Sequence, residues 1–296
     1  MKYESGVATG SYPVVYTLQF NHSISYLFQL ENLFWQIGPI ALFAILGFIF
    51  LVIFSFLKKQ KELVIFYIFP LLYFLYVGSW HTKFIRYMIP ILPFLIIAAS
   101  FLLFEITKKF KKTGFILIST FLLLTAFWAM AFFSIYTKEQ TRISASEWVY
   151  LNVPVDKTIL TEQWDDTLPV PIGTLNLNRY KDLNLTMYEP DNSSKINYLT
   201  NNLSKGDYII FNSRRLYGTL INLTKEYPIT SNYYKLLFEG KLGYKQVAEF
   251  TSYPSIFGFE IKDDVSEETF QVYDHPKVII FKNTKHFSIN DYLKIL

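Results

Sequence analysis

The feature that most constrains this chain is a series of four long segments without a charged residue. They cover residues 37–57, 63–80, 88–104 and 113–136 and are 21, 18, 17 and 24 residues long. A helix needs about 20 apolar residues to cross the hydrocarbon core of a bilayer. The third segment is short, but Arg86 and Tyr87 precede it and can lie at the membrane interface while the helix continues. Buried helices of a soluble core are a poorer explanation, because the four segments follow one another with short charged loops between them. We therefore predict four transmembrane helices, at 37–57, 63–80, 86–104 and 113–136.

Charge divides the chain at about residue 137. Residues 1–136 contain 10 Lys and Arg and 4 Asp and Glu, whereas residues 137–296 contain 18 Lys and Arg and 20 Asp and Glu.

The composition excludes a disordered protein, because 51% of the residues are hydrophobic and only 18% are charged. The chain has no cysteine, which excludes a disulfide framework, a Cys-ligated zinc site and a thiol nucleophile.

Two lysine-rich loops predict the orientation in the membrane. Lys58–Glu62 contains three Lys and Lys108–Lys112 contains four, so the positive-inside rule places both loops in the cytoplasm. Both termini of an integral plasma-membrane protein are then extracytoplasmic. Anionic lipid headgroups are the expected neighbours of these loops, and the net charge of +4 gives no support to a nucleic-acid partner.

We accordingly predict three regions: an extracytoplasmic N-terminal segment (1–36), the four-helix transmembrane region (37–136) and an extracytoplasmic soluble α/β domain (137–296). In the last region a helix is expected at 144–151, with Ser144 or Ser146 as its cap. Strand-like apolar runs alternate with helix-like segments, which favours a partly parallel sheet. The expected strands are 158–161, 208–211 and 277–282, and the expected helices are 216–225 and 233–239.

The connection between the second and third predicted helices carries two cations and a histidine. His81, Lys83 and Arg86 are predicted to lie on the extracytoplasmic side, against the usual charge bias, so a specific anionic partner is one interpretation. A lipid-linked phosphate in the headgroup layer would suit the ammonium and the planar guanidinium. The simpler interpretation is interfacial anchoring, in which the long side chains reach ordinary lipid phosphates.

The α/β region contains a second group of candidate residues. Paired carboxylates such as Asp165 and Asp166 can do acid–base work or bind a divalent cation, although a solvated turn is the simpler interpretation. A sugar contact is another interpretation, in which Trp164 stacks on a sugar ring and the two aspartates accept hydrogen bonds from its hydroxyls. Ser213–Arg215 follows a predicted strand, at the position where α/β sheets bind ligands, and a structural arginine is the alternative there. We expect no metal site and no cofactor.

Several short motifs resemble the C-terminal membrane part of GT-C glycosyltransferases, the group of protein O-mannosyltransferases and aminoarabinose transferases. The most specific is Lys83-Phe84-x-Arg86-Tyr87 leading into Pro90-x-x-Pro93. The others, in chain order, are Val7–Gly10, Tyr16–Phe20, Tyr26–Asn32, Asp207–Ile210, Tyr227-Pro228, Tyr233-Tyr234, Leu237-Phe238, Gly240 and Leu242–Tyr244. Each motif is loose, but their order and the predicted topology are similar to that family over nearly the whole chain.

The resemblance implies an enzyme that transfers a sugar, such as a hexose or mannose, from an undecaprenyl- or dolichyl-phosphate donor to an acceptor outside the membrane. It implies that Lys83, Arg86 and His81 hold the donor phosphate, that Tyr87 orients this site, and that the outer domain helps to select the acceptor. The lipid-linked sugar is then a co-substrate, and membrane lipids are the other partners.

The family's catalytic carboxylate, which serves as base for the acceptor hydroxyl, has no counterpart in this sequence. Glu4 and Glu31 precede the first predicted helix but do not match the family's motif. We therefore expect this chain to be the C-terminal part of a split or truncated enzyme, inactive alone, with an N-terminal half encoded upstream. The alternative is a non-catalytic, membrane-anchored envelope protein whose outer domain binds a glycan or a protein.

Overall fold

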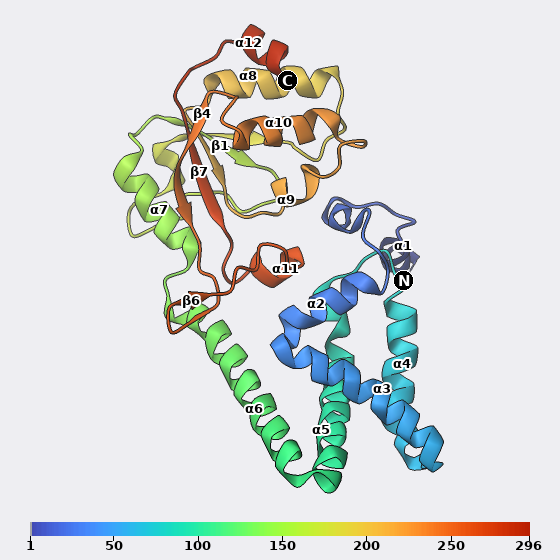
Figure 1. The fold of residues 1–296 in the computed structure, drawn as a ribbon. Helices are drawn as coiled ribbons and strands as arrows, with labels where there is room; N and C mark the ends of the chain where they lie inside the picture. Colours follow the sequence, from blue (N-terminus) through green and yellow to red (C-terminus); the bar gives the residue numbers. More distant parts are fainter. Residues whose placement is uncertain (1) are drawn as a thin grey trace. The chain divides into compact units, whose positions relative to one another are not determined.

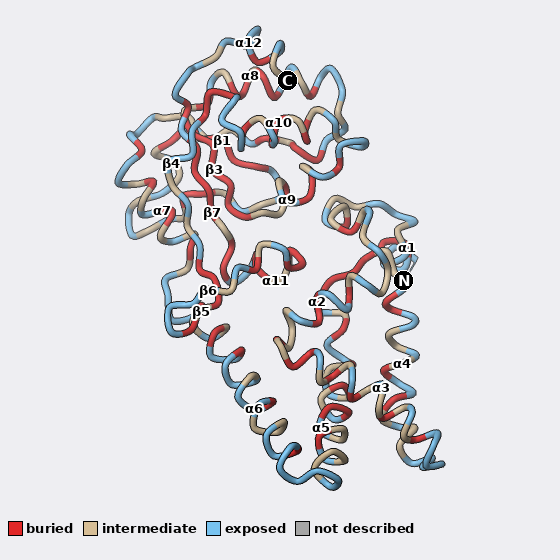
Figure 2. The backbone as a smooth tube through the Cα atoms, in the orientation of Figure 1, coloured by how far each residue is buried: buried red, intermediate tan, exposed pale blue. Residues whose placement is uncertain are grey.

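The computed structural model describes residues 2–296 and divides into two compact units. The first unit runs to Ser134 and also includes Pro254–Phe270, which we call the return segment. The second unit comprises Ile135–Tyr253 and Gln271–Leu296. Each unit contains buried residues of its own (Figure 2). The return segment lies inside the range predicted for the α/β domain, so the chain leaves that domain and comes back to it.

The first unit is helical (Figure 1). Three stretches are long and apolar enough to cross a membrane: Leu27–Lys58, Ile85–Lys109 and Lys111–Asn152. The helix α4 has 14 residues and does not reach this length, so the fourth span stays a prediction. The α-helices are α1 Lys2–Thr9, α2 Leu27–Ile37, α3 Ala41–Lys58, α4 Val64–Val77, α5 Leu92–Lys109 and α6 Lys111–Phe133, and the 3₁₀ turns are η1 Val15–Phe20, η2 Gly38–Ile40, η3 Lys61–Leu63 and η4 Ile85–Ile91.

Helices α3 and α5 approach closely at one small residue. A Cβ added to Gly47 of α3 would lie 2.5 Å from the backbone nitrogen of Ala99 in α5. Ala98 and Ala99 are fully buried at this crossing. Small residues serve this purpose in membrane helices, because dispersion contacts between close backbones replace the hydrophobic drive that water provides elsewhere.

The second unit is built on a five-stranded sheet with the order β2-β1-β3-β7-β4. Strands β2, β1 and β3 are parallel, and β7 runs antiparallel to both β3 and β4, which confirms a partly parallel sheet. Its strands are β1 Thr158–Glu162, β2 Lys181–Leu185, β3 Tyr208–Phe211, β4 Tyr244–Phe250 and β7 Val278–Asn283, and its helices are α7 Thr141–Asn152, α8 Ser193–Lys205, α9 Tyr217–Leu220, α10 Pro228–Phe238 and α12 Ile289–Ile295.

Helices cover both faces of this sheet, with α7 on one side and α8 and α10 on the other (Figure 1). Side chains alternate between the faces along each strand. Ile210 packs with Val149 of α7 in one buried cluster. The next residue, Phe211, contacts Tyr234 and Phe238 of α10 at ring-centroid distances of 5.8 and 6.1 Å.

Two local predictions for this unit were wrong. The cap of α7 is Gln140, whose side chain accepts a hydrogen bond from the backbone N–H of Arg142 at 2.8 Å. Ser146 is instead inside the helix, where its hydroxyl donates to the Arg142 carbonyl. Only Tyr217–Leu220 of the predicted 216–225 helix is α-helical.

Candidate functional site

The first candidate site is the connecting segment, Trp80–Tyr87, between α4 and α5. The N-terminal residues hold it in place: the hydroxyl of Thr82 donates to the Val7 carbonyl at 2.8 Å, and its N–H donates to the Ala8 carbonyl at 3.1 Å. The ring of Phe84 packs edge-on against Phe20 of η1, with centroids 5.1 Å apart. Residues of three separate sequence motifs therefore meet at this segment.

Lys83 is buried without a counterion. Its side chain is 2% exposed, and its Nζ donates to the carbonyl of His81 at 3.0 Å. Within residues 2–296, no carboxylate lies within ion-pair distance of this ammonium. Burial lowers the pKa of Lys83, and burial together with the nearby Lys83 charge lowers the pKa of His81. When it is protonated, Nζ of Lys83 has three N–H bonds, of which one is directed at the His81 carbonyl and two can donate elsewhere.

Arg86 is exposed, and its guanidinium faces aromatic rings rather than acids. Its Cζ lies 4.1 Å from the ring centroid of Phe84 and 5.7 Å from that of Tyr87. Tyr87 packs edge-on against Trp80, and its carbonyl accepts a hydrogen bond from the Tyr73 hydroxyl at 2.8 Å. The described chain supplies no carboxylate partner for Arg86 either.

The return segment brings two acidic residues to this part of the helical unit. A carboxylate oxygen of Glu267 accepts a hydrogen bond from the backbone N–H of Ile85 at 3.2 Å, and the Glu267 N–H donates to Asn32 Oδ1 at 2.8 Å. Glu268 lies beside Gln19, whose Nε2 donates to its carboxylate at 3.3 Å. Burial raises the pKa of Glu267.

These glutamates were not among the predicted site residues. The signal in the sequence was the acidic run from Asp263 to Glu268. Glu267 makes no ion pair with Lys83 or Arg86; it also accepts hydrogen bonds from the N–H and hydroxyl of Thr269. Its oxygens are therefore engaged in holding the backbone of the connecting segment.

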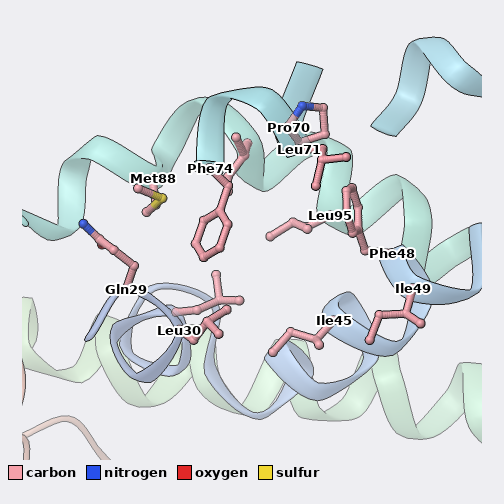
Figure 3. Close-up of a pocket in the computed structure, with 12 residues that line it drawn as sticks. Gln29, Leu30, Ile45, Phe48, Ile49, Pro70, Leu71, Phe74, Met88 and Leu95 are labelled. Carbon is pink, nitrogen blue, oxygen red and sulfur yellow. The ribbon is translucent and has the colours of Figure 1, made fainter. Parts of the chain in front are cut away.

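An apolar cavity of about 240 Å³ lies next to this segment, between α2, α3, α4 and the start of α5 (Figure 3). Met88 of η4, two residues after Arg86, lines it. The lining contains one polar side chain, Gln29, which is 2% exposed and whose amide has no hydrogen-bond partner for either atom among residues 2–296. The other lining residues are Leu30, Leu33, Ile45, Phe48, Ile49, Pro70, Leu71, Phe74, Ile91 and Leu95. Its shape and chemistry suit an apolar chain with a polar group near Gln29.

The second candidate group lies at the carboxyl ends of β1 and β3. Asp165 is buried, with its side chain 4% exposed, and accepts a hydrogen bond from the Ser213 hydroxyl at 2.5 Å. Arg142 of α7 lies 3.9 Å from Asp165 and 3.3 Å from Asp166. Arg215 donates to the Trp164 carbonyl at 2.8 Å. The structure thus brings together the predicted Trp164–Asp166 and Ser213–Arg215 segments.

This second group is largely satisfied internally. The Asp165 carboxylate is occupied by Ser213 and Arg142, and burial raises its pKa. Trp164 is 55% exposed, and the side chain of Asp166 is 72% exposed, so these two are open to a ligand. The arrangement fastens two loops together and leaves one aromatic face and one carboxylate at the surface. Among residues 2–296, no group of three or more His, Asp or Glu side chains forms a possible metal site.

Comparison with known proteins returns no match to a protein-family model, a curated protein or a solved structure.

Proposed function

We propose that this chain is the C-terminal part of an integral-membrane glycosyltransferase that takes a sugar from a polyprenyl phosphate. The observation that carries the proposal is the pair of cations in the connecting segment, Lys83 and Arg86. Neither has a carboxylate partner within the described residues, and Lys83 is buried.

A buried ammonium without a counterion costs several kcal/mol, and this cost is offset where a bound ligand brings an anion. A phosphate group supplies it. Lys83 offers a point charge with two free N–H bonds, and Arg86 offers a planar fork that can bind two phosphate oxygens. In sugar transfer, the acceptor oxygen forms a bond to the anomeric carbon while the bond from that carbon to the phosphate oxygen breaks, and negative charge grows on the departing phosphate. Lys83 and Arg86 stabilise that charge.

The cavity beside Met88 supports a lipid carrier rather than a free phosphate. Its apolar walls fit the first units of an isoprenoid chain, and it shares the η4 turn with Arg86. A ligand with a phosphate at Arg86 and an apolar tail in the cavity therefore uses both features together. The proposal assigns no general base to this chain.

The proposed topology has four spans, with the lysine loops at Lys58–Glu62 and Lys108–Lys112 in the cytoplasm. The fourth span is α4, whose 14 residues cover about 21 Å at 1.5 Å per residue. Leu63, the last residue of η3, and Gly78–Trp80 extend this apolar stretch to the 18 residues of the prediction. The connecting segment and both termini are then extracytoplasmic.

Native mass spectrometry of the chain in nanodiscs with undecaprenyl phosphate tests the proposal. Wild type should retain the phosphate more tightly than undecaprenol, which has the same tail. Lys83→Met and Arg86→Gln should each weaken binding about tenfold or more, since a hydrogen bond to a charged group contributes about 1.5–3 kcal/mol. Lys111→Met, at the exposed first residue of α6, is the matched control. Equal retention of the two lipids, or variants that bind like wild type, would show that the proposal is wrong.

A non-catalytic, membrane-anchored binding protein is the second candidate. The internal pairing of Asp165 with Ser213 and Arg142 favours it, because that group then lacks a free acid–base pair. In this case Trp164 and Asp166 bind a glycan, and the chain retains undecaprenyl phosphate and undecaprenol equally in the experiment above.

A further inference from the structure

The return segment begins with a short hairpin whose tip consists of exposed aromatic residues. Strands β5 (Ser255–Ile256) and β6 (Phe259–Glu260) pair antiparallel and are joined by Phe257 and Gly258. Phe257 is 86% exposed and Phe259 is 74% exposed, which is rare for side chains of this size. Nothing in the described chain covers them.

The hairpin is fastened to the end of a candidate membrane helix. The N–H of Ser255 donates to Oγ of Ser134 at 2.9 Å, and the two hydroxyls lie 3.1 Å apart. Ser134 directly follows α6, and β6 lies beside that end of the helix (Figure 1). The charge-free segment 113–136, which contains most of α6, ends at Tyr136, and Lys138 is the first charged residue after it. The hairpin therefore sits at the level where the helix leaves the hydrocarbon layer.

The apolar surface of α6 continues to that level. Met130 is 58% exposed and Phe133 is 66% exposed, as expected for side chains that face lipid tails. Phe257 and Phe259 add two exposed aromatic side chains to a hairpin that is attached at this end of α6. Because the exposed side chains at the end of this candidate membrane helix are apolar, lipid is favoured over another protein as the partner of the tip.

The backbone of the turn gives an independent reason to look for a partner. Phe257 has φ +51° and Gly258 has φ +83°, so both central residues of this two-residue turn are left-handed. Such turns strongly favour Asn-Gly or Asp-Gly, and a bulky aromatic residue is strained there. Packing within the described chain does not offset this strain, because Phe257 is almost fully exposed.

We propose that the β5–β6 hairpin is a second membrane attachment, with Phe257 and Phe259 inserted into the interfacial layer of the bilayer that α6 crosses. Aromatic side chains are enriched at that depth, and the charged Glu260 and Lys262 that follow can lie among the headgroups. This attachment holds the return segment, which includes Glu267, close to the membrane surface. It depends on α6 spanning the membrane and not on any enzymatic activity.

The absence of cysteine makes a direct test possible. Phe257→Cys gives a single thiol for a nitroxide label in the full chain, reconstituted in nanodiscs of phosphatidylcholine and phosphatidylglycerol. Electron paramagnetic resonance then compares collisions with oxygen, which concentrates in lipid, and with a nickel chelate, which stays in water. Lys241→Cys, an exposed position in the second unit, is the matched control.

We expect the label at 257 to collide preferentially with oxygen and the label at 241 with the nickel chelate. Adding Phe259→Asp to the Phe257→Cys variant should shift the label at 257 towards water, because the tip loses its second aromatic anchor. If both positions show the same preference for the chelate, the hairpin lies in water and the proposal is wrong. Low collision rates with both agents at 257 would indicate burial against protein, which also overturns it.

Discussion

Glu267 accepts a hydrogen bond from the backbone N–H of Ile85 at 3.2 Å, across 182 positions of the sequence. Ile85 lies between the two cations of the connecting segment, so this contact sets the backbone from which Lys83 and Arg86 extend. A residue from the far end of the chain thereby controls the geometry of the candidate anion site. The first prediction follows from this contact.

Glu267→Ala should loosen the connecting segment, because the buried N–H of Ile85 loses its acceptor. A buried donor left without a partner costs about 1–3 kcal/mol. Hydrogen exchange of peptides covering 80–90, measured by mass spectrometry on the chain in nanodiscs, should show faster exchange at Ile85. Glu260→Gln, at an exposed position of the same return segment, is the control and should leave exchange unchanged. Protection of Ile85 equal to wild type in Glu267→Ala would contradict the assigned role.

Glu162 should make the second unit less stable as pH rises. Burial raises the pKa of this carboxyl from 4.5 to about 8, although the hydroxyl of Tyr234 donates to it. The folded state therefore binds the proton more tightly than the unfolded state does. Its contribution to stability is complete below about pH 4.5 and is lost as pH approaches 8. At about 1.36 kcal/mol per pKa unit, the loss is at most about 5 kcal/mol.

Urea denaturation of the chain in nanodiscs, monitored by tryptophan fluorescence, measures this loss. The measurement is made between roughly pH 5 and pH 8, where the linkage relation predicts the change in stability. Glu162→Gln mimics the protonated carboxyl and should flatten the pH dependence. Glu239→Gln, at an exposed residue paired with Lys241, should retain the wild-type slope. An unchanged slope in Glu162→Gln would assign the effect to another group.

Asp165 and Asp166 are adjacent but should differ strongly in their contribution to stability. Asp165→Ala removes the buried acceptor of Ser213 and should lower the free energy of unfolding by about 2–4 kcal/mol. Asp166→Ala removes an exposed partner of Arg142 and should cost less than about 1 kcal/mol. Urea midpoints of the two variants provide the comparison. Equal losses would mean that Asp165 is not the residue that fastens the two loops.

Gln29→Leu should raise the stability of the first unit. The Gln29 amide is buried without a hydrogen-bond partner for either atom, and its burial costs about 1–3 kcal/mol. Leucine has a similar volume and suits the apolar lining of the cavity (Figure 3). Thermal denaturation in detergent should show a higher midpoint than wild type, whereas Gln60→Leu, at an exposed position, should not. A lower midpoint for Gln29→Leu would mean that the amide has a stabilising partner.

Local patterns were enough to predict the main elements of the fold. The apolar runs locate α3, α4, α5 and α6, because a helix must shield its own backbone polar groups wherever water is absent. In the second unit, the apolar run at 208–211 and the run at 277–282 predict β3 and β7 to within one residue. Strands β2 and β4 and helices α8 and α12 were missed. The signal in β2 is weak because the strand is short, only two of its five residues are apolar, and only Leu185 is buried.

The candidate sites were predictable only as separate segments. Asp165 and Ser213 each follow a strand, and their contact depends on β1 and β3 being neighbours, which no local pattern encodes. The burial of Lys83 depends on the N-terminal residues that pack around the connecting segment, and Glu267 reaches Ile85 only because the chain returns to the helical unit.

The sequence by itself therefore determined that the chain has a membrane-compatible helical part and an α/β part, because hydropathy and side-chain periodicity act over a few residues at a time. The tertiary structure alone decided which cation is buried, which carboxylates are already paired, and where the return segment lies. These properties depend on desolvation and on hydrogen bonds between residues far apart in the chain, and both arise only when distant segments pack together.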